Sequence, residues 1–276
     1  MFELPEYITF ADQMNSTLSG KYVQYGSLGN SPHKFVWYNR TQQEFEELTR
    51  GKCIGTARVR GRWLFLDLEP SYLLLLGECG GKILYHEPGS PLPVKYHLLL
   101  NFADDSALTI MTTMWGAMEL YERGQELERK YIKDMRLTPL DPGFNFDYFS
   151  YLINQLLQGE KRSVKSLLTQ DQIIPGLGNA IAQDIMFNAY LHPRHSLADL
   201  TPDQIHALYT AILVTTRAII EKGGRNDESD LFGRPGGYVR LMSNRSVGKP
   251  CPRCGETVEK VQFLGGSCYV CPGCQK

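Results

Sequence analysis

Short β-type apolar runs dominate the first half of the chain, and a helical apolar period dominates the second half. Residues Leu4–Leu18 carry apolar side chains at helical spacing, which predicts an amphipathic helix. The following runs are separated by turn residues such as Gly29–Pro32, and many short strands at regular spacing indicate a β-sandwich or a barrel. The expected strands are Tyr22–Tyr25, Lys34–Tyr38, Gly55–Arg60, Trp63–Leu68, Tyr72–Leu76, Lys82–His86, His97–Phe102 and Leu108–Thr112.

Beyond Met135 the apolar period becomes helical, after a linker that contains Asp141-Pro142-Gly143. The last helix begins at the start signal Thr201-Pro202 and stops at Gly223-Gly224. A flexible stretch, residues 223–249, is expected after it. The fold class is therefore α+β and multidomain, with domains expected at residues 1–135, 145–222 and 223–276. The predicted helices are Tyr148–Leu157, Val164–Thr169, Asn179–Ala189 and Pro202–Glu221.

Two Cys-Pro-x-Cys knuckles lie close to the C-terminus. Cys251 and Cys254 form the first, and Cys271 and Cys274 form the second. Two such turns joined by a short β-hairpin supply the four thiolates that a tetrahedral Zn²⁺ takes. Cys268 also stands three residues before Cys271, but the repeated Cys-Pro-x-Cys pattern favours Cys274, which leaves Cys268 as a buried thiol. The C-terminus is thus predicted to be a zinc ribbon with one structural Zn²⁺.

Charge changes this picture only locally. The formal net charge is -1, so no global excess of positive charge indicates a nucleic-acid partner. The stretch from Arg234 to Arg253 nevertheless carries five cations and no carboxylate, including Arg240 and Arg245. Such a stripe supports phosphate contacts, although a solvated arginine-rich loop has the same composition. There is no membrane-length apolar run and no secretory signal, so metal-type cysteines predict a cytoplasmic protein.

The glycine-rich turn before Asn179 joins two predicted helices and would let backbone N–H groups approach a phosphate. With Lys165, Gly176-Leu-Gly-Asn179, His192-Pro193 and the ribbon in this order, the chain resembles the formamidopyrimidine-DNA glycosylase / endonuclease VIII family of base-excision repair. The resemblance covers nearly the whole length. It implies an N-terminal helix and β-sandwich, a helix–two-turns–helix domain, and a zinc finger.

The resemblance also assigns DNA-binding residues. Lys165 and Asn179 match the residues with which the family's helix–two-turns–helix holds phosphates at the lesion. Taken locally, they also fit a surface lysine and an ordinary N-cap asparagine. Arg240 and Arg245, in the basic stripe beside the finger, are expected to contact DNA too. The implied partner is double-stranded DNA that is damaged or distorted, bound by a monomer.

The N-terminus departs from the family at its catalytic residue. Met1-Phe-Glu-Leu-Pro-Glu6 looks like the family's Met-Pro-Glu-Leu-Pro-Glu, in which Met is removed and the proline amine attacks C1′, with the next glutamate as acid/base. Here Phe2 stands at the proline position, while Glu3 and Glu6 match. Because bulky Phe2 resists removal of Met1, the α-amine is expected one residue too far from the family's site. If Met1 were trimmed, Phe2 would offer a primary amine beside Glu3.

Other catalytic parts are altered as well. The family's Arg-Gly-Lys-Tyr hairpin reads Arg-Gly-Arg-Trp, with Arg62 at the lysine, and its His-Leu-Gly-Met segment reads Leu75–Glu78. Met114 and Trp115 stand in the loop that supplies wedge residues, where they fit apolar wedges or, as the favoured interpretation, buried core. Gly266 stands at the position where the family's zinc finger has an arginine that binds a DNA phosphate.

These losses leave two main hypotheses. One is an active, divergent DNA glycosylase/AP lyase that uses a primary N-terminal amine with Glu3. The other is a non-catalytic relative that recognises distorted DNA, and losses concentrated at the nucleophile, wedge and finger tip favour it. A third possibility is that the architecture serves RNA or a protein partner.

Overall fold

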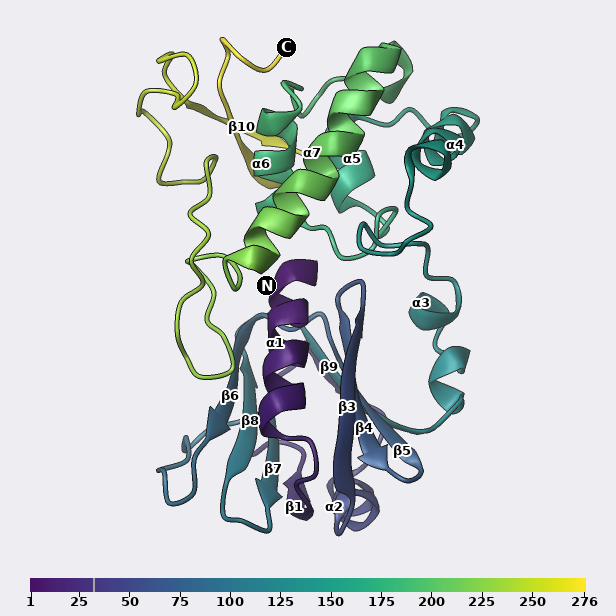
Figure 1. Cartoon of the computed structure of the whole chain (residues 1–276), viewed down its shortest axis with the longest axis vertical. Coiled ribbons are helices and arrows are strands. Elements are labelled where there is room, and N and C mark those ends of the chain that lie inside the picture. Colours follow the sequence, from purple (N-terminus) through teal and green to yellow (C-terminus); the bar gives the residue numbers. More distant parts are fainter. Residues whose placement is uncertain (32) are drawn as a thin grey trace. The chain divides into compact units, whose positions relative to one another are not determined.

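The computed structural model describes residues 1–31 and 33–276, which form two compact units (Figure 1). Unit 1 comprises Met1–Met135 and Lys222–Gly237, and unit 2 comprises Arg136–Glu221 and Tyr238–Lys276. This division differs from the three expected domains, because the ribbon shares a unit with the helices and the stretch after the last helix is divided between the units. Of the turn expected at Gly29–Pro32, Pro32 lies outside the described residues.

Unit 1 is a β-sandwich with a long N-terminal helix. The apolar pattern predicted the helix and either a sandwich or a barrel, and the family resemblance implied the sandwich. Helix α1 (Leu4–Thr17) lies beside β3 (Figure 1), and its apolar stripe, which includes Tyr7, Phe10 and Met14, is buried in the sandwich core. The first sheet has the order β1 (Val23–Ser27), β7 (Leu98–Phe102), β8 (Ala107–Thr112), β6 (Gly81–His86). The second has the order β2 (Val36–Tyr38), β9 (Gly116–Glu122), β5 (Tyr72–Gly77), β4 (Trp63–Glu69), β3 (Cys53–Arg60).

Several elements of the sandwich domain were not predicted from the sequence, and two of them are instructive. Strand β9 carries Glu119, a charged residue that interrupts the apolar pattern and yet is buried, because its carboxylate accepts from Arg129 Nε at 2.6 Å. Helix α2 (Gln42–Thr49) begins with a capping box, in which Thr41 and Glu44 bond each other's backbone N–H. The Thr-x-x-Glu spacing is a signal that would have located this helix start. The short 3-10 helix η1 (Gln125–Glu128) and α3 (Lys130–Lys133) complete the domain.

Unit 2 combines a helical core with a C-terminal β-hairpin. Its elements are α4 (Phe146–Leu157), α5 (Val164–Thr169), α6 (Asn179–Asn188), the 3-10 helix η2 (Leu197–Asp199), α7 (Pro202–Glu221), β10 (Glu259–Phe263) and β11 (Gly266–Val270). The four predicted helices and the hairpin are therefore present. Ile181 and Ile185 of α6 and Leu208 and Ile212 of α7 are fully buried in one core. Even α7, the longest helix, lacks the apolar stretch that crossing a bilayer requires, and the same holds for every other helix that the structure describes.

The stretch after α7 is packed, so the prediction of a flexible segment is wrong. In unit 1, Leu231 is fully buried; its N–H donates to Gln13 Oε1 at 2.9 Å, and its carbonyl accepts from Tyr85 N–H at 2.8 Å. Gln13 Nε2 also donates to Asp230 Oδ2 at 2.8 Å. The Gln13 side chain of α1 and the Tyr85 N–H of β6 thus take the hydrogen bonds that the Leu231 backbone would otherwise make with water.

Candidate functional site

The residue at the expected nucleophile position belongs to the core of unit 1. The Phe2 ring is fully buried and makes edge-to-face contacts with Tyr7 and Phe10, with centroids 6.1 and 4.9 Å away. The Phe2 N–H donates to the Cys79 carbonyl at 2.9 Å. An amide nitrogen is a poor nucleophile because resonance with its carbonyl occupies the lone pair. With Met1 in place, position 2 contributes a core side chain and an amide N–H.

Met1 is held by three polar partners in the same unit. Its ammonium lies 3.1 Å from Glu228 Oε1, its carbonyl accepts from Arg225 Nη2 at 3.1 Å, and Arg62 Nη1 donates to its sulfur at 3.2 Å. A Cβ at Gly80 would lie only 2.8 Å from Met1 Cα, so a glycine is needed there. The local structure therefore accommodates a retained methionine.

Glu6, expected near the catalytic centre, is an ion-pair partner at the N-terminus of α1. It is 3% exposed and accepts from Arg225 Nε and Nη2, both at 2.9 Å, and from the Glu3 N–H at 2.9 Å. Burial lowers the pKa of Arg225, but Glu6 and Glu3 outweigh it, and the net shift is upward. Arg225 therefore stays charged, and its bidentate pairing with Glu6 compensates two buried charges.

Glu3 and Arg62, the remaining catalytic candidates, lie in the same part of unit 1. Glu3 is the N-cap residue of α1 and is 4% exposed. Arg62 lies in the turn between β3 and β4 and pairs with Glu78 at 3.1 Å. Burial raises the pKa of Glu78, and Arg62 opposes that rise.

Sequence reasoning missed Arg225 as the residue that joins this cluster. Its signal was local: it directly follows the helix-stopping Gly223-Gly224 and precedes the acidic residues Asp227 and Glu228.

Met114 and Trp115 are exposed, so the interpretation of them as buried core is wrong. Met114 is 51% exposed and Trp115 40%. Trp115 directly precedes β9. Its ring stacks on the ring of Trp37 in β2, with the ring centroids 5.2 Å apart and the planes at 15°. It also contacts Phe35 at 4.7 Å, and the Gly116 N–H donates to the Phe35 carbonyl at 3.0 Å. Pairing at the sheet edge therefore fixes an exposed aromatic stack, which consists of Phe35, Trp37 and Trp115.

Lys165 and the hairpin tip meet in unit 2. Lys165 is 2% exposed, so it is not a surface lysine, and its Nζ donates to the carbonyls of Phe263 at 2.5 Å and Gly266 at 3.4 Å. A Cβ at Gly266 would lie 3.4 Å from that Nζ and 3.7 Å from Asn179 Oδ1. Glycine at the tip thus lets the hairpin backbone approach both side chains.

Asn179 is the exposed first residue of α6. The N-cap is Gly178, so the alternative of an ordinary N-cap asparagine is wrong. Gly178 brings no side chain to the first turn, where the helix dipole favours an anion.

Arg240 and Arg245 of the basic stripe lie in a loop that Asp184 of α6 anchors. Asp184 is buried and accepts from Tyr238 Oη at 2.9 Å and from the N–H groups of Leu241 and Met242 at 2.9 and 2.8 Å. Arg240 is half-buried and Arg245 is exposed.

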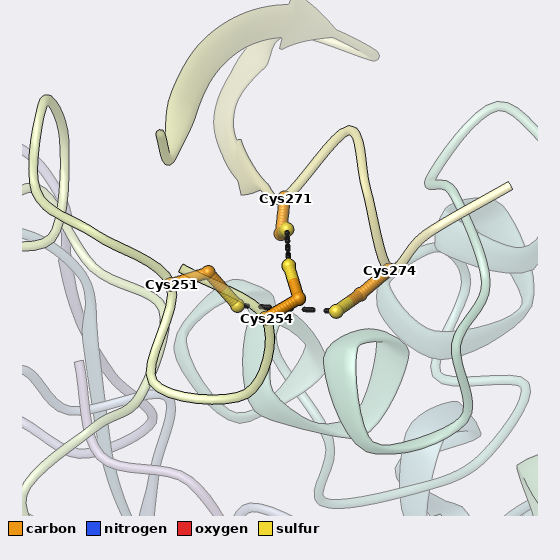
Figure 2. Close-up of side chains that lie close together, drawn as sticks. All are labelled: Cys251, Cys254, Cys271 and Cys274. Atoms are coloured by element: carbon orange, nitrogen blue, oxygen red, sulfur yellow. Dashed lines mark hydrogen bonds between the residues drawn. The ribbon is translucent and has the colours of Figure 1, made fainter. Parts of the chain in front are cut away.

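The four predicted ligand cysteines converge in unit 2 (Figure 2). Their sulfur atoms all lie within 4.8 Å of one another, with Cys251–Cys274 at 3.9 Å and Cys254–Cys271 at 3.3 Å. Tetrahedral Zn²⁺ with bonds of about 2.3 Å places sulfur atoms about 3.8 Å apart, so the donor set fits that ion. Cys268 is fully buried in β11 and lies outside the cluster, in agreement with the predicted choice of knuckle.

Comparison with known proteins agrees with this architecture. The formamidopyrimidine-DNA glycosylase N-terminal domain model matches residues 1–129, and the formamidopyrimidine-DNA glycosylase H2TH domain model matches residues 137–229. The chain belongs to the formamidopyrimidine-DNA glycosylase / endonuclease VIII family. It is 25% identical over 279 residues to the formamidopyrimidine-DNA glycosylase of Bacillus cereus, covering 100% of this chain and 99% of the relative. It is 27% identical over 280 residues to that of Bacillus licheniformis, covering 100% of both.

Solved structures of the family share the fold. Lactococcus lactis Fpg in complex with DNA containing an abasic site has a TM-score of 0.84 and 23% identity, over 99% of each chain. The wild-type enzyme with DNA containing N7-benzyl-Fapy-dG has a TM-score of 0.86 and 23% identity, again over 99% of each chain.

Proposed function

We propose that the chain binds double-stranded DNA at damaged or distorted sites, as a monomer, and does not perform the family's proline-type Schiff-base chemistry. The packing of Phe2 carries this proposal: at the position of the family's reactive proline, a large ring is fully buried against Tyr7 and Phe10. Glu6, which matches a glutamate of the family's N-terminal motif, accepts from two nitrogens of the Arg225 guanidinium. DNA in the solved relatives, including abasic-site DNA, supports the choice of partner.

Phosphate contacts are assigned to unit 2. Asn179 is exposed at the positive end of α6, and Arg245 is exposed in the basic stripe. Lys165 is buried and donates to two hairpin carbonyls, so in this arrangement it adds positive charge near the phosphate that Asn179 would contact. Arg240 adds positive charge to the same loop.

We assign the four-cysteine cluster one structural Zn²⁺, bound by Cys251, Cys254, Cys271 and Cys274 in the reducing cytoplasm. Four thiolates leave no open coordination position, so the ion would contribute stability and no catalytic water. Its role would be to fix the hairpin that meets Lys165.

Two measurements on the full chain test the proposal. Borohydride reduction with abasic-site duplex should trap no covalent adduct, while a mobility shift should show tighter binding to abasic or gapped duplex than to intact duplex. Asn179→Ala should weaken binding by roughly tenfold, because a hydrogen bond to a charged group is lost. Equal affinity for intact and distorted duplexes would remove the proposal.

The alternative, an active lyase, is favoured by one observation: Glu3 is retained next to position 2 and is buried there. It requires removal of Met1 so that Phe2 gains a primary amine. The mass of the N-terminal peptide decides this point. A chain that begins at Phe2 and gives a borohydride adduct at Phe2 would establish the lyase.

A further inference from the structure

Gln183 is a buried side chain between Asn179 and the hairpin in unit 2. It is fully buried on α6. Its Oε1 accepts from the Tyr269 N–H of β11 at 3.0 Å. Its Nε2 donates to the Asn179 carbonyl at 3.0 Å, to Asn179 Oδ1 at 3.3 Å and to the Ser267 carbonyl at 3.5 Å. One amide therefore bonds both α6 and the hairpin.

These partners fix the orientation of two amide groups. A backbone N–H can only donate, so the Gln183 atom that faces Tyr269 must be Oε1. Nε2 then faces Asn179, and two backbone carbonyls on that side agree with a donor. A donor in turn requires an acceptor, so the Asn179 atom that faces Gln183 must be Oδ1.

These contacts determine which atom of the Asn179 amide faces solvent. A Cβ at Gly266 would lie 3.7 Å from Asn179 Oδ1 and 4.0 Å from its Cγ, so the oxygen also faces the hairpin. Asn179 is exposed, and its Nδ2 has no hydrogen-bond partner among residues 1–31 and 33–276. The amide therefore presents two N–H donors to solvent at the N-terminal end of α6.

We propose that Gln183 is a positioning residue for DNA binding: it relays the fixed polarity of the Tyr269 N–H to Asn179, so that Asn179 Nδ2 rather than Oδ1 faces a DNA phosphate. The inference rests on the proposed phosphate contact of Asn179. A phosphate oxygen accepts hydrogen bonds only, so an asparagine turned the other way would repel it. Preorganisation by Gln183 removes the cost of choosing between the two amide orientations.

Gln183→Glu tests the relay with almost no change of shape. A carboxylate still accepts from Tyr269, but its second oxygen faces Asn179 Oδ1, which should turn the asparagine amide around. We expect duplex affinity to fall about tenfold, as for Asn179→Ala, because the same charge-assisted hydrogen bond is lost. Gln155→Glu is the matched control, since it adds the same charge to unit 2 at an exposed site of α4.

A double-mutant cycle separates positioning from a general structural effect. In the Asn179→Ala background, Gln183→Glu should cost no more affinity than Gln155→Glu does, because the group that Gln183 orients is absent. Full additivity of the two losses overturns the relay. Wild-type affinity for Gln183→Glu, with weak binding by Asn179→Ala, also overturns it. If Asn179→Ala binds as wild type does, the proposed phosphate contact itself fails, which is a distinct result.

A measurement on the unmutated chain covers the case in which Gln183→Glu does not fold. In a DNA titration followed by the side-chain amide resonances, the Asn179 Nδ2 protons should shift, while the buried Gln183 Nε2 protons should not. Movement of the Gln183 resonance with a silent Asn179 resonance contradicts the proposal.

Discussion

Single residues at the start of the chain link the fold to the proposed absence of proline-type chemistry. The family places a small ring at position 2 and keeps its nitrogen reactive, whereas Phe2 places a large ring in the core and makes its nitrogen a hydrogen-bond donor to Cys79. Packing and catalysis thus compete for one position. The same holds for Glu6, whose carboxylate is committed to Arg225.

Replacing Phe2 should therefore affect stability. Phe2→Ala is expected to lower the free energy of unfolding by about 3–5 kcal/mol, because it leaves a cavity between Tyr7 and Phe10. Urea unfolding measures the change. Phe232→Ala is the control in unit 1, since Phe232 is 41% exposed, and it should cost far less. Equal effects of the two substitutions would mean that Phe2 is not core.

Arg225 is the second position at which stability should depend on one side chain. Arg225→Met should destabilise the chain by about 3–5 kcal/mol, because Glu6 remains as a buried charge without its partner. Adding Glu6→Gln should recover part of that loss, and this non-additivity is the signature of the ion pair. Exposed Arg234→Met serves as the control. A strictly additive pair of losses would argue against a direct Glu6–Arg225 interaction.

At the scale of elements, apolar periodicity predicted the helices and strands that bury apolar faces. It did not predict the segments that polar contacts hold in place. The helix at Pro202–Glu221 and the strands around Trp63–Leu68 follow from apolar patterns. Strand β9 was not predicted because its buried Glu119 interrupts the apolar pattern. That charge is paired with Arg129, which lies outside the strand. The stretch after α7 read as flexible because its glycines were visible in the sequence, while its bonds to Gln13 and Tyr85 were not.

The candidate site shows the same limit. Spacing alone identified the four cysteines, because chelation by two knuckles is local in sequence. The burial of Lys165 was not predictable, since its partners are carbonyls of Phe263 and Gly266, about a hundred residues away in a turn without polar side chains. Sequence patterns report side chains, and backbone acceptors of this kind leave no trace in them.

The aromatic stack at the edge of the second sheet should contribute to recognition of distorted DNA. Trp115→Ala is expected to weaken binding to gapped duplex by about 1–3 kcal/mol, the range for stacking of one base on an aromatic ring, and to change intact-duplex binding less. Mobility shifts at one salt concentration measure both. Tyr131→Ala, at a 65% exposed position of α3, is the control. An equal loss on both duplexes would assign Trp115 a general rather than a lesion-related role.

At the scale of the whole molecule, the two units carry separate reporters. All three tryptophans, Trp37, Trp63 and Trp115, belong to unit 1, whereas the four-cysteine cluster belongs to unit 2. Removal of the metal by a strong chelator should speed amide hydrogen exchange across β10 and β11 and expose reactive thiols, because binding of a structural Zn²⁺ is coupled to folding. Tryptophan emission should stay nearly constant, since the core of unit 1 contains no residue of the hairpin.

Substitutions at two cysteines sharpen this prediction. Cys254→Ser should lose the metal, measured by elemental analysis, and should reproduce the exchange pattern of the chelated chain. Cys268→Ser should retain the metal, because its sulfur lies outside the cluster, and any destabilisation it causes should come from polar burial in β11. Added Zn²⁺ should restore slow hydrogen exchange in the hairpin of the chelated wild-type chain. It should not restore it in Cys254→Ser, which lacks one ligand. Metal loss in both variants would place Cys268 among the ligands, and a parallel change in tryptophan emission would show that the two units unfold as one.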